Sequence, residues 1–342
     1  LASFRARWRR PLCGEYRGRV VLSAPPPQSG MQVLETLHLL SAHDLPALGL
    51  PTRSPEAFGI LASALRVAMV DRNAYVGDPD HAAVPAAGVA SAAFARERTA
   101  LVGNNPMPAR IPPGDPWDED RLPPSGACAA LDPAGPAVTA TEAAARIVPG
   151  TGVDAGDDGL GETTHLSAVD AAGNAVSLTY TQGQYFGTGV WAAGTFLNSG
   201  LFNFSSSDSS ANALGPRRVP SSTIAPTIVL EDGRVRMVVG SPGSGAIPPA
   251  IVETILYTLD YGLDPLEALR MPRVLPVAGN LRLQLEDGFD AAVAAHARRI
   301  GWIPRPLPPT DRTFGGVHVI VREGAHWVGA ADPRRNGEVR GH

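Results

Sequence analysis

The clearest pattern in the chain is a pair of alternating segments joined by a short polar turn. In residues 163–169 and again in residues 175–181, apolar and polar side chains alternate with the period of a β-strand. The second segment places Val176, Leu178 and Tyr180 on one face and hydroxyl side chains on the other. The turn between the segments contains Asp, Gly and Asn, which tolerate left-handed backbone conformations. The pattern predicts a β-hairpin.

The register of this hairpin would bring Thr179 and Thr181 back towards Thr163. A hydroxyl on a strand is not by itself a nucleophile, because it needs a base. A chain that cuts itself before a threonine creates that base, since the new α-amine has a pKa of about 7.7–8.0. The hairpin alone leaves two interpretations of Thr163, an ordinary strand residue or a nucleophile activated by self-cleavage.

The rest of the hydrophobic pattern predicts both helices and strands. Helices are expected at residues 31–41, from 54 onwards, 249–259, from 264 onwards and 289–300. Strands are expected at residues 19–23, 228–230, 235–239, 281–285, 317–321 and 327–330. This mixture indicates a mixed α/β or α+β fold.

Residues 103–161 differ from their surroundings in composition. They are rich in Pro, Gly, Ala and Asp and show little periodicity, which is typical of a linker. The segment ends immediately before the hairpin. A mobile segment there would suit self-processing, because the scissile peptide must be reachable and the new ends must separate.

Composition excludes several classes of function. The 342 residues are 44% hydrophobic and 18% charged, which is typical of a globular protein. The net charge of −4, without a basic run, does not indicate nucleic-acid binding, and no apolar stretch is long enough for a transmembrane helix. The absence of lysine excludes a Walker-A loop, a Schiff base and a Ser-Lys dyad. Cys13 and Cys128 are too few for a disulfide framework or a thiol-rich metal site, and a single bridge between them stays open.

The run TTHLSAVD, followed by GNAVS, TYT and FGTG, resembles the signature of the γ-glutamyltranspeptidase family. Segments resembling other parts of that family are spread over nearly the whole chain, at residues 8–30, 71–80, 220–227 and 332–334. Members of this family are N-terminal-nucleophile hydrolases that cleave themselves before a threonine into a large and a small subunit. The resemblance implies an α+β fold, the four-layer αββα sandwich of these hydrolases. It also implies that the N-terminal half of the large subunit is missing from this chain, which begins without Met or a signal-peptide pattern.

The resemblance divides the chain into three parts. Residues 1–102 correspond to the C-terminal part of the large subunit, residues 103–162 to the linker that leads to the cleavage site, and residues 163–342 to the small catalytic subunit. Both subunits would come from one precursor. No metal or organic cofactor is implied. Family members are often periplasmic or secreted, and the compartment of this chain stays open.

The resemblance also assigns catalytic roles. Cleavage is expected between Glu162 and Thr163, and Thr163 corresponds to the nucleophile, with its own amine as the base. Thr181 corresponds to the threonine that forms a hydrogen bond with the nucleophile. Gly243 and Ser244 correspond to the oxyanion-hole pair, which is Gly-Gly in the family. Only backbone N–H groups are needed there, so Ser244 can serve if its backbone geometry is permitted.

Two positions correspond to the serines that bind the substrate α-carboxylate. Alignment backwards from the Pro-Thr pair at 226–227 identifies Ser222 and Thr223, whereas alignment on Ser-Ser identifies Ser221 and Ser222. Ser222 is common to both alignments. The arginine that binds the same carboxylate in the family belongs to the missing half.

The positions for the substrate α-ammonium depart from the family. Where the family has Asn, then Gln or Glu, then Asp, this chain has Gly183, Gly200 and Asn203. Gln182 and Gln184 flank the first of these and are candidate substitutes. The departures predict weak γ-glutamyl activity and tolerance of acyl groups without the amine, such as glutaryl.

The resemblance implies a self-processing threonine amidohydrolase or acyltransferase. It would cleave γ-glutamyl amides such as glutathione through a γ-glutamyl-enzyme and pass the acyl group to water or to an amino-acid or peptide acceptor. One alternative is a cephalosporin-acylase-like enzyme of the same fold with altered acyl specificity. Another is a non-catalytic, unprocessed homologue that serves as a binding or structural protein.

Overall fold

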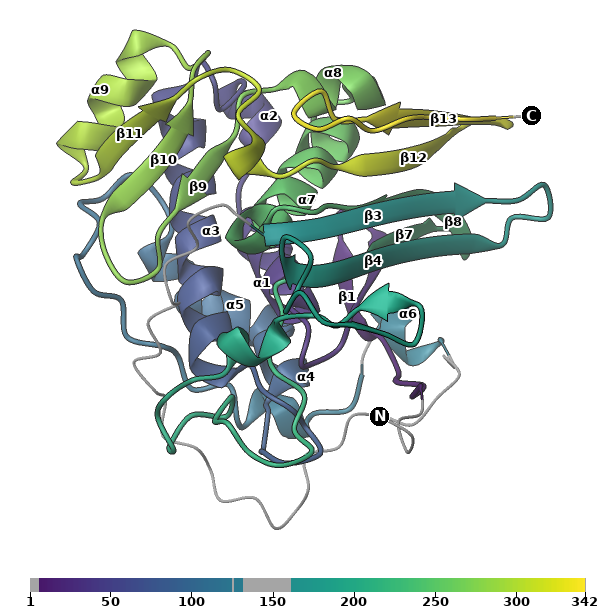
Figure 1. The fold of residues 1–342 in the computed structure, drawn as a ribbon. Coiled ribbons are helices and arrows are strands. Elements are labelled where there is room, and N and C mark those ends of the chain that lie inside the picture. The colour runs from purple at the N-terminus through teal and green to yellow at the C-terminus, as the bar shows by residue number, and fades with distance from the viewer. Residues whose placement is uncertain (1–5, 125, 132–160, 342) are drawn as a thin grey trace.

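The computed structural model describes residues 6–124, 126–131 and 161–341 (Figure 1). Its centre is a six-stranded sheet in the order β1-β2-β7-β8-β12-β13, in which all neighbouring strands are antiparallel. The strands are β1 (Leu12–Tyr16), β2 (Arg19–Ser23), β7 (Thr227–Glu231), β8 (Arg234–Gly240), β12 (His318–Glu323) and β13 (His326–Ala331). The pairing of β2 with β7 joins the part of the chain before residue 162 to the part after it.

Helices cover one face of this sheet and form the main core with it. Helix α1 packs on β1 and β2, α7 packs on β8, and α3 lies against α1 (Figure 1). The helices are α1 (Gly30–Ser41), α2 (Leu45–Leu48), α3 (Pro55–Tyr75), α4 (Ala86–Val89), α5 (Ala92–Arg98), α6 (Gly126–Ala129), α7 (Ile247–Ile255), α8 (Pro265–Arg270) and α9 (Ala291–Arg299). A π-helical turn, Leu256–Asp260, continues α7.

Helix α3 shows why the predicted helices form where they do. The side chain of Ser54 accepts a hydrogen bond from the backbone N–H of Ala57, and Pro55 occupies the first helical position. The following residues are almost all buried. The predicted start of this helix is therefore confirmed, and it becomes the central helix of the core.

The predicted hairpin is also confirmed and lies on the opposite face of the sheet from the helices (Figure 1). Its strands are β3 (Gly161–Val169) and β4 (Ala175–Gln184). The Ser177 hydroxyl donates to the Val239 carbonyl of β8 at 3.0 Å, and the Ser167 hydroxyl donates to the His318 carbonyl of β12 at 3.2 Å. Side-chain hydroxyls therefore hold the hairpin against the sheet.

Two smaller sheets complete the described fold. A three-stranded sheet in the order β11-β10-β9 packs beside α9; its strands are β9 (Val274–Pro276), β10 (Arg282–Glu286) and β11 (Ile303–Leu307). A short hairpin pairs β5 (Trp191–Ala192) with β6 (Thr195–Phe196). Strand β11 was not predicted, and it contains Pro304 and Pro306, which are uncommon in strands. Its edge position tolerates both, since an edge strand does not need every backbone N–H.

The first part of the linker-like segment follows the surface of the body. Met107 and Ile111 are buried, and Cys128 forms a disulfide with Cys13 of β1. Residues 132–160 lie outside the described residues. In the part of the chain that the structure describes, no helix is both long and apolar enough to cross a membrane.

Candidate active site

The predicted nucleophile, its neighbour across the hairpin and the peptide before it form one chain of hydrogen bonds. The Thr163 hydroxyl donates to Thr181 Oγ1 at 3.0 Å. The Thr181 hydroxyl in turn donates to the carbonyl oxygen of Glu162 at 3.1 Å. The backbone N–H of Gly183 also donates to Thr181 Oγ1, at 3.0 Å. Thr181 therefore connects the hydroxyl of Thr163 to the carbonyl of the peptide that precedes it.

A β-bulge produces this arrangement. Thr163 pairs with Thr181, but Glu162 pairs with Gly183, so one residue of β4 is left over between them. Bulges change the direction of side chains and are common beside active sites. Gly183 has φ +82°, a conformation that suits glycine, and a Cβ there would meet Ser199 Oγ at 2.3 Å. Gly183 is therefore needed where it lies, and buried Ser199 was not predicted as part of the site.

His165 lies on the face of the hairpin that packs against the central sheet. Its ring nitrogens form hydrogen bonds with the hydroxyls of Thr179 (2.8 Å) and Ser167 (3.1 Å). Burial, with a smaller contribution from neighbouring His318, lowers the pKa of His165 to about 3. The ring lies so close to Gly240 that a Cβ there would approach it to 2.2 Å. A neutral histidine therefore fixes the hairpin above the end of β8.

The predicted oxyanion-hole residues follow the end of β8. Ser167 of β3 lies over Val238, and His165 lies over Gly240, so β8 advances towards the Thr163 end of the hairpin. Gly243 and Ser244 come directly after this point. In the described parts of the chain, neither of their backbone N–H groups makes a hydrogen bond. Within the residues described, two amide donors are therefore left without a partner in the turn that follows β8.

The backbone conformation of this turn requires glycine at position 243 and is unusual for the serine at position 244. Gly243 has φ +128° and packs so closely that a Cβ would lie 2.5 Å from the Cα of Gly315. Ser244 has φ +54°, in the left-handed region that a residue with a Cβ rarely adopts. The hydroxyl of Ser241 accepts from the N–H of Gly316 at 3.1 Å. The turn is thus supported by the chain at residues 315–316.

A buried ion-pair network anchors that supporting loop. Arg273 forms an ion pair with Asp332 at 2.6 Å and donates to the carbonyl of Phe314 at 2.8 Å. Arg334 forms ion pairs with the same Asp332 (3.1 Å) and with Glu286 (2.5 Å). Burial opposes ionisation, yet the two guanidinium groups hold the pKa of Asp332 below its ordinary value. The Asp-Pro-Arg segment near the C-terminus therefore helps to position the glycine-rich turn.

The side chain of Glu162 has partners of its own. Its Oε1 accepts from Arg312 Nη2 at 3.0 Å, and Arg312 Nη1 donates to the hydroxyl of Tyr185 at 2.6 Å. The Arg312 guanidinium also lies over the Tyr185 ring, 5.7 Å from its centre. Arg335 donates to the Arg312 carbonyl at 3.5 Å. None of these partners was predicted, since Arg312 is 150 positions from Glu162.

The predicted substrate-binding residues form a second group. Asn203 donates through its amide to the carbonyl of Ser221 at 3.2 Å. A Cβ at Gly200 would lie 3.4 Å from Pro220, which places it beside the same loop. The backbone N–H of Ser222 donates to the carbonyl of Pro27 at 2.9 Å, and no hydrogen bond joins Ser222 to Thr163 within the described residues.

Thr223 likewise makes no hydrogen bond to Thr163 among the residues described. The structure therefore joins Thr163, Thr181 and Gly183 directly. The pair 222–223 and the turn at 243–244 are not linked to them by a direct hydrogen bond.

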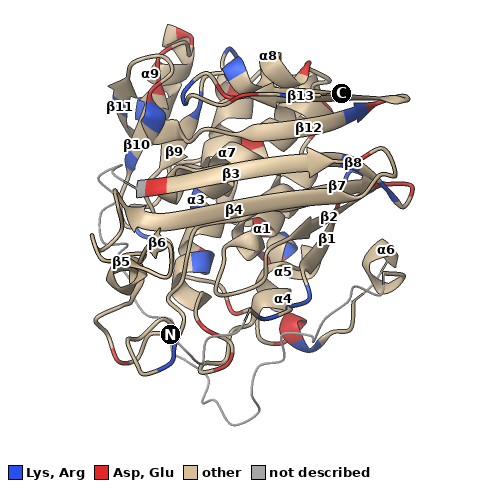
Figure 2. Cartoon of the chain, turned by 45° about the vertical axis from the view of Figure 1, so that its right-hand side comes forward, with Lys and Arg blue, Asp and Glu red and all other residues tan. Residues whose placement is uncertain are grey.

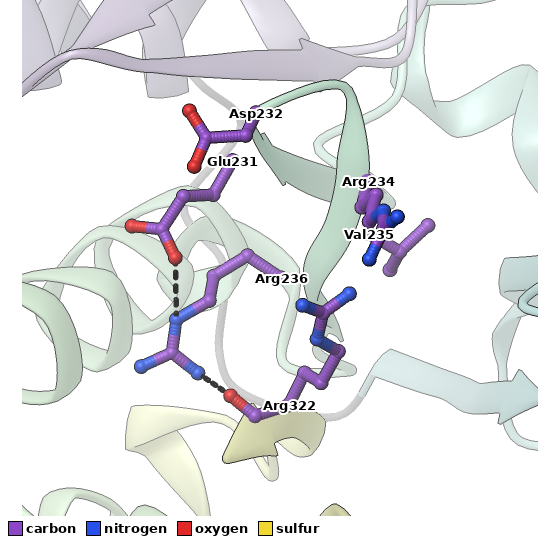
Figure 3. A pocket seen from close by; sticks show the side chains of 6 residues that line it. All are labelled: Glu231, Asp232, Arg234, Val235, Arg236 and Arg322. Atoms are coloured by element: carbon purple, nitrogen blue, oxygen red, sulfur yellow. Dashed lines mark hydrogen bonds and ion pairs between the residues drawn. The ribbon is translucent and has the colours of Figure 1, made fainter. Parts of the chain in front are cut away.

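The charges of the protein lie mostly away from the hairpin. Strands β3 and β4 carry a single charged residue, at the start of β3 (Figure 2). A charged hollow lies at the opposite end of β8, at its turn with β7 (Figure 3). There Arg236 forms an ion pair with Glu231 at 3.4 Å and donates to the carbonyl of Arg322. The hollow shares no residue with the candidate site.

The arrangement of sheet, hairpin and helices defines a class of fold. Cephalosporin acylase from Bacillus halodurans has the same mixed α/β fold, with a TM-score of 0.77 and 23% sequence identity over 100% of this chain and 55% of that chain. The sequence then identifies the family within this class. The model of the family described as Gamma-glutamyltranspeptidase matches residues 1–342. The chain belongs to the γ-glutamyltranspeptidase family.

The curated relatives include glutathione hydrolase and acylase proenzymes. The chain is 32% identical to the glutathione hydrolase proenzyme of Escherichia coli (strain K12), over 98% of this chain and 53% of the relative. It is 29% identical to the Acylase ACY 1 proenzyme of Pseudomonas sp. (strain SE83), over 94% of this chain and 50% of the relative. The chain spans about half the length of these relatives.

Proposed function

We propose that the complete protein is a self-processing threonine amidohydrolase that cuts itself between Glu162 and Thr163. The observation that carries this proposal is the continuous set of hydrogen bonds from the Thr163 hydroxyl through Thr181 to the Glu162 carbonyl. This arrangement can polarise the carbonyl and orient the hydroxyl that attacks it. The relatives named proenzymes support the same conclusion.

The cleavage proceeds in two steps. Thr163 Oγ attacks the carbonyl carbon of Glu162, the C–N bond breaks, and the nitrogen of Thr163 takes a proton, which leaves an ester between the two residues. Water then hydrolyses the ester. The products are a carboxylate on Glu162 and a free α-amine on Thr163, which becomes the base for later turnovers.

In the mature enzyme the same oxygen would attack an amide of the substrate. The α-amine of Thr163 accepts the hydroxyl proton and delivers it to the leaving amine. The N–H groups of Gly243 and Ser244 would stabilise the oxyanion of the tetrahedral intermediate. Hydrolysis of the acyl-enzyme by water gives an acid, and attack by an amine acceptor gives a new amide.

The proposed architecture is the four-layer αββα sandwich, of which this chain supplies part. Residues 1–102 would be the end of the large subunit, 103–162 the segment leading to the cut and 163–342 the small subunit. The outward face of the hairpin is apolar and exposed, as Leu166 (54%) and Leu178 (53%) show. An exposed apolar face of this kind supports a further layer supplied by the remaining half of the protein.

The proposed substrates are γ-glutamyl amides such as glutathione, with the carboxylate bound at Ser222 and Thr223. A second candidate is an acylase of different specificity, favoured by one observation. The amide of Asn203 is already donated to Ser221, and Gly183 and Gly200 have no side chain to bind an ammonium group. Poor activity on γ-glutamyl-p-nitroanilide relative to glutaryl-p-nitroanilide would favour the acylase.

The decisive experiment for the proposed function is N-terminal sequencing of the purified complete protein. We expect a new chain that begins at Thr163 in the wild type, and a single uncut chain for Thr163→Ala. Thr164→Ala is the matched control, because Thr164 is adjacent but exposed on the outer face of the hairpin, and it should still be cut. An intact wild-type protein would refute the proposal and favour the non-catalytic homologue.

A further inference from the structure

The acidic side chain before the proposed cut is held by a cationic cluster that belongs to the part of the chain after the cut. Arg312 binds the carboxylate of Glu162 at 3.0 Å and the hydroxyl of Tyr185 at 2.6 Å. The guanidinium of Arg335 is close enough to Arg312 and Glu162 that their charges act on its pKa, although burial is the larger influence and lowers it. Arg312 binds the carboxylate directly, and Arg335 is joined to Arg312 by a hydrogen bond to its carbonyl at 3.5 Å.

The cluster has more hydrogen-bond donors than the carboxylate of Glu162 binds. Arg335 Nε is buried and has no hydrogen-bond partner within the described residues. The side chains of Arg312 and Glu162 are 47% and 33% exposed, so solvent and small molecules can reach the pair. Unpaired buried donors and partly exposed guanidinium groups are suited to recognition of a carboxylate.

The chemistry of self-cleavage indicates which carboxylate would replace that of Glu162. In the ester formed during the cut, the Glu162 carbonyl is attached to Thr163 Oγ, as the acyl group of a substrate is in the acyl-enzyme. Three carbons separate the carbonyl carbon of a glutamate from its side-chain carboxyl carbon, the same number as in a glutaryl group. Glu162 therefore presents to Thr163 a five-carbon dicarboxylic acyl group whose distal end is bound by Arg312.

We propose that Arg312, Tyr185 and Arg335 form a carboxylate-binding site, occupied by Glu162 before the cut and by the distal carboxylate of a glutaryl-type acyl group afterwards. The proposal rests on the proposed threonine amidohydrolase function, takes its acylase alternative, and places the acyl carboxylate at Arg312 instead of at Ser222 and Thr223. In the acylation step Thr163 Oγ attacks the proximal carbonyl, the C–N bond breaks, and the amine leaves with the proton carried by the Thr163 α-amine. The distal carboxylate takes no part in bond making and serves only to position the acyl chain.

The loop that carries Arg312 makes this position suitable. Arg312 lies three residues before Gly315, which packs against Gly243 of the proposed oxyanion turn. Tyr185 follows β4 directly, four residues after Thr181. Since Arg312 binds the side chain of Glu162, the cluster is one residue away from the proposed nucleophile along β3.

The test compares two anilides of equal acyl length on the cleaved complete protein. Glutaryl-p-nitroanilide carries the distal carboxylate, and pentanoyl-p-nitroanilide lacks it. We expect the wild type to prefer the glutaryl compound. Arg312→Met should lower kcat/KM for glutaryl-p-nitroanilide by about 10–100-fold, within the range for a lost hydrogen bond to a charged group, and leave the pentanoyl value unchanged. Arg312→Lys should restore part of the loss.

Rates are expressed per cleaved chain, so that slow processing is not mistaken for weak catalysis. Arg305→Met is the matched control, because Arg305 is exposed on β11, outside the site, and it should alter neither anilide. Glu162→Gln tests occupation before the cut and should slow self-cleavage. Cleavage of Glu162→Gln at the wild-type rate would overturn that part of the proposal.

Four results would overturn the assignment to the acyl group. Equal hydrolysis of both anilides by the wild type would overturn the assignment and leave the amidohydrolase function intact. An effect of Arg312→Met only on the dependence of transfer on glycylglycine would show that the site binds the acceptor carboxylate instead. A loss in Ser222→Ala without a loss in Arg312→Met would place the acyl carboxylate at Ser222. A cleaved wild type that hydrolyses γ-glutamyl-p-nitroanilide but neither of these two anilides would overturn this proposal and leave the proposed function intact.

Discussion

The two faces of the β3–β4 hairpin have opposite characters. The inner face carries hydroxyl and imidazole side chains, and these bind one another and the carbonyls of β8 and β12. The outer face carries Leu166, Val176, Leu178 and Tyr180, each about half exposed. A sheet with one solvated face normally buries its apolar side and exposes its polar side.

In this hairpin the polar face is buried against the sheet and the apolar face is exposed, and the two faces therefore have different roles. A polar face can be buried because its groups find partners, and His165, Thr179 and Ser167 form such a set. That leaves the hydroxyls of Thr163 and Thr181 in a fixed geometry. The side chains of the apolar face stay about half exposed within the described residues, so their stabilisation would depend on what a longer protein places over them. Substitutions on the two faces should therefore behave differently.

The largest effect is expected from Thr181→Val on the inner face. Valine keeps the shape of threonine but removes the oxygen between the Thr163 hydroxyl and the Glu162 carbonyl. Self-cleavage and amide hydrolysis should both slow by about 10–100-fold, the range for groups that position or assist proton transfer. The cut is followed by gel electrophoresis and hydrolysis by anilide assay. Wild-type rates in this variant would show that Thr181 is only a strand residue.

A smaller loss is expected from Gly240→Ala, which fills the space occupied by the His165 ring. The added Cβ would lie 2.2 Å from the ring, so the ring must move and its hydrogen bonds weaken. We expect a loss of about 1–3 kcal/mol in the free energy of unfolding, measured with urea. Gly279→Ala is the control, because its Cβ meets nothing within 4 Å. Equal stability of the two variants would mean that the hairpin shifts freely on the sheet.

The pH dependence of stability should reveal the same histidine. The folded pKa of His165, about 3, is below its ordinary value of 6.5, so the unfolded chain binds a proton that the folded chain excludes. The contribution of His165 to the free energy of unfolding is fully present above pH 6.5 and is lost progressively as the pH drops towards 3. The loss between pH 6.5 and 5.5 should be about 1 kcal/mol. His165→Gln should flatten this part of the curve, and an unchanged curve would count against a buried neutral histidine.

The smallest effect in this 342-residue chain is expected on the outer face. Leu178 is 53% exposed, so Leu178→Thr should alter the free energy of unfolding by less than about 0.5 kcal/mol. In the complete protein the same substitution should cost about 1.5–3 kcal/mol, because a covered leucine loses its buried area. Equal small effects in both proteins would mean that nothing covers this face.

Local patterns were enough to predict the hairpin and most of the core elements. The period of two and the turn composition defined β3 and β4, and their register brought Thr181 to Thr163. The cap at Ser54 defined the start of α3. These features depend on residues close in sequence, and local physical rules apply to them directly.

The remaining parts of the site depend on contacts between distant residues. Arg312 reaches Glu162 only because the loop after β11 folds back beside the start of β3. Ser199 is placed by a β-bulge whose position no propensity predicts. The left-handed backbone of Ser244 contradicts the preference of serine, and the pairing of Cys13 with Cys128 was one of two open alternatives. The roles proposed for these residues stay predictions.

The pairing of β2 with β7 has a consequence for the molecularity of refolding. Residues 20–23 pair with residues 227–230 across the central sheet, whereas the disulfide joins two cysteines that both precede residue 162. If the chain is cut as proposed, no covalent bond within the described residues links the two pieces, and their shared core becomes an interface between two molecules. Refolding of the cut protein would then be bimolecular, and its unfolding midpoint would rise with protein concentration. The uncut chain would refold as a single molecule, with a midpoint independent of concentration.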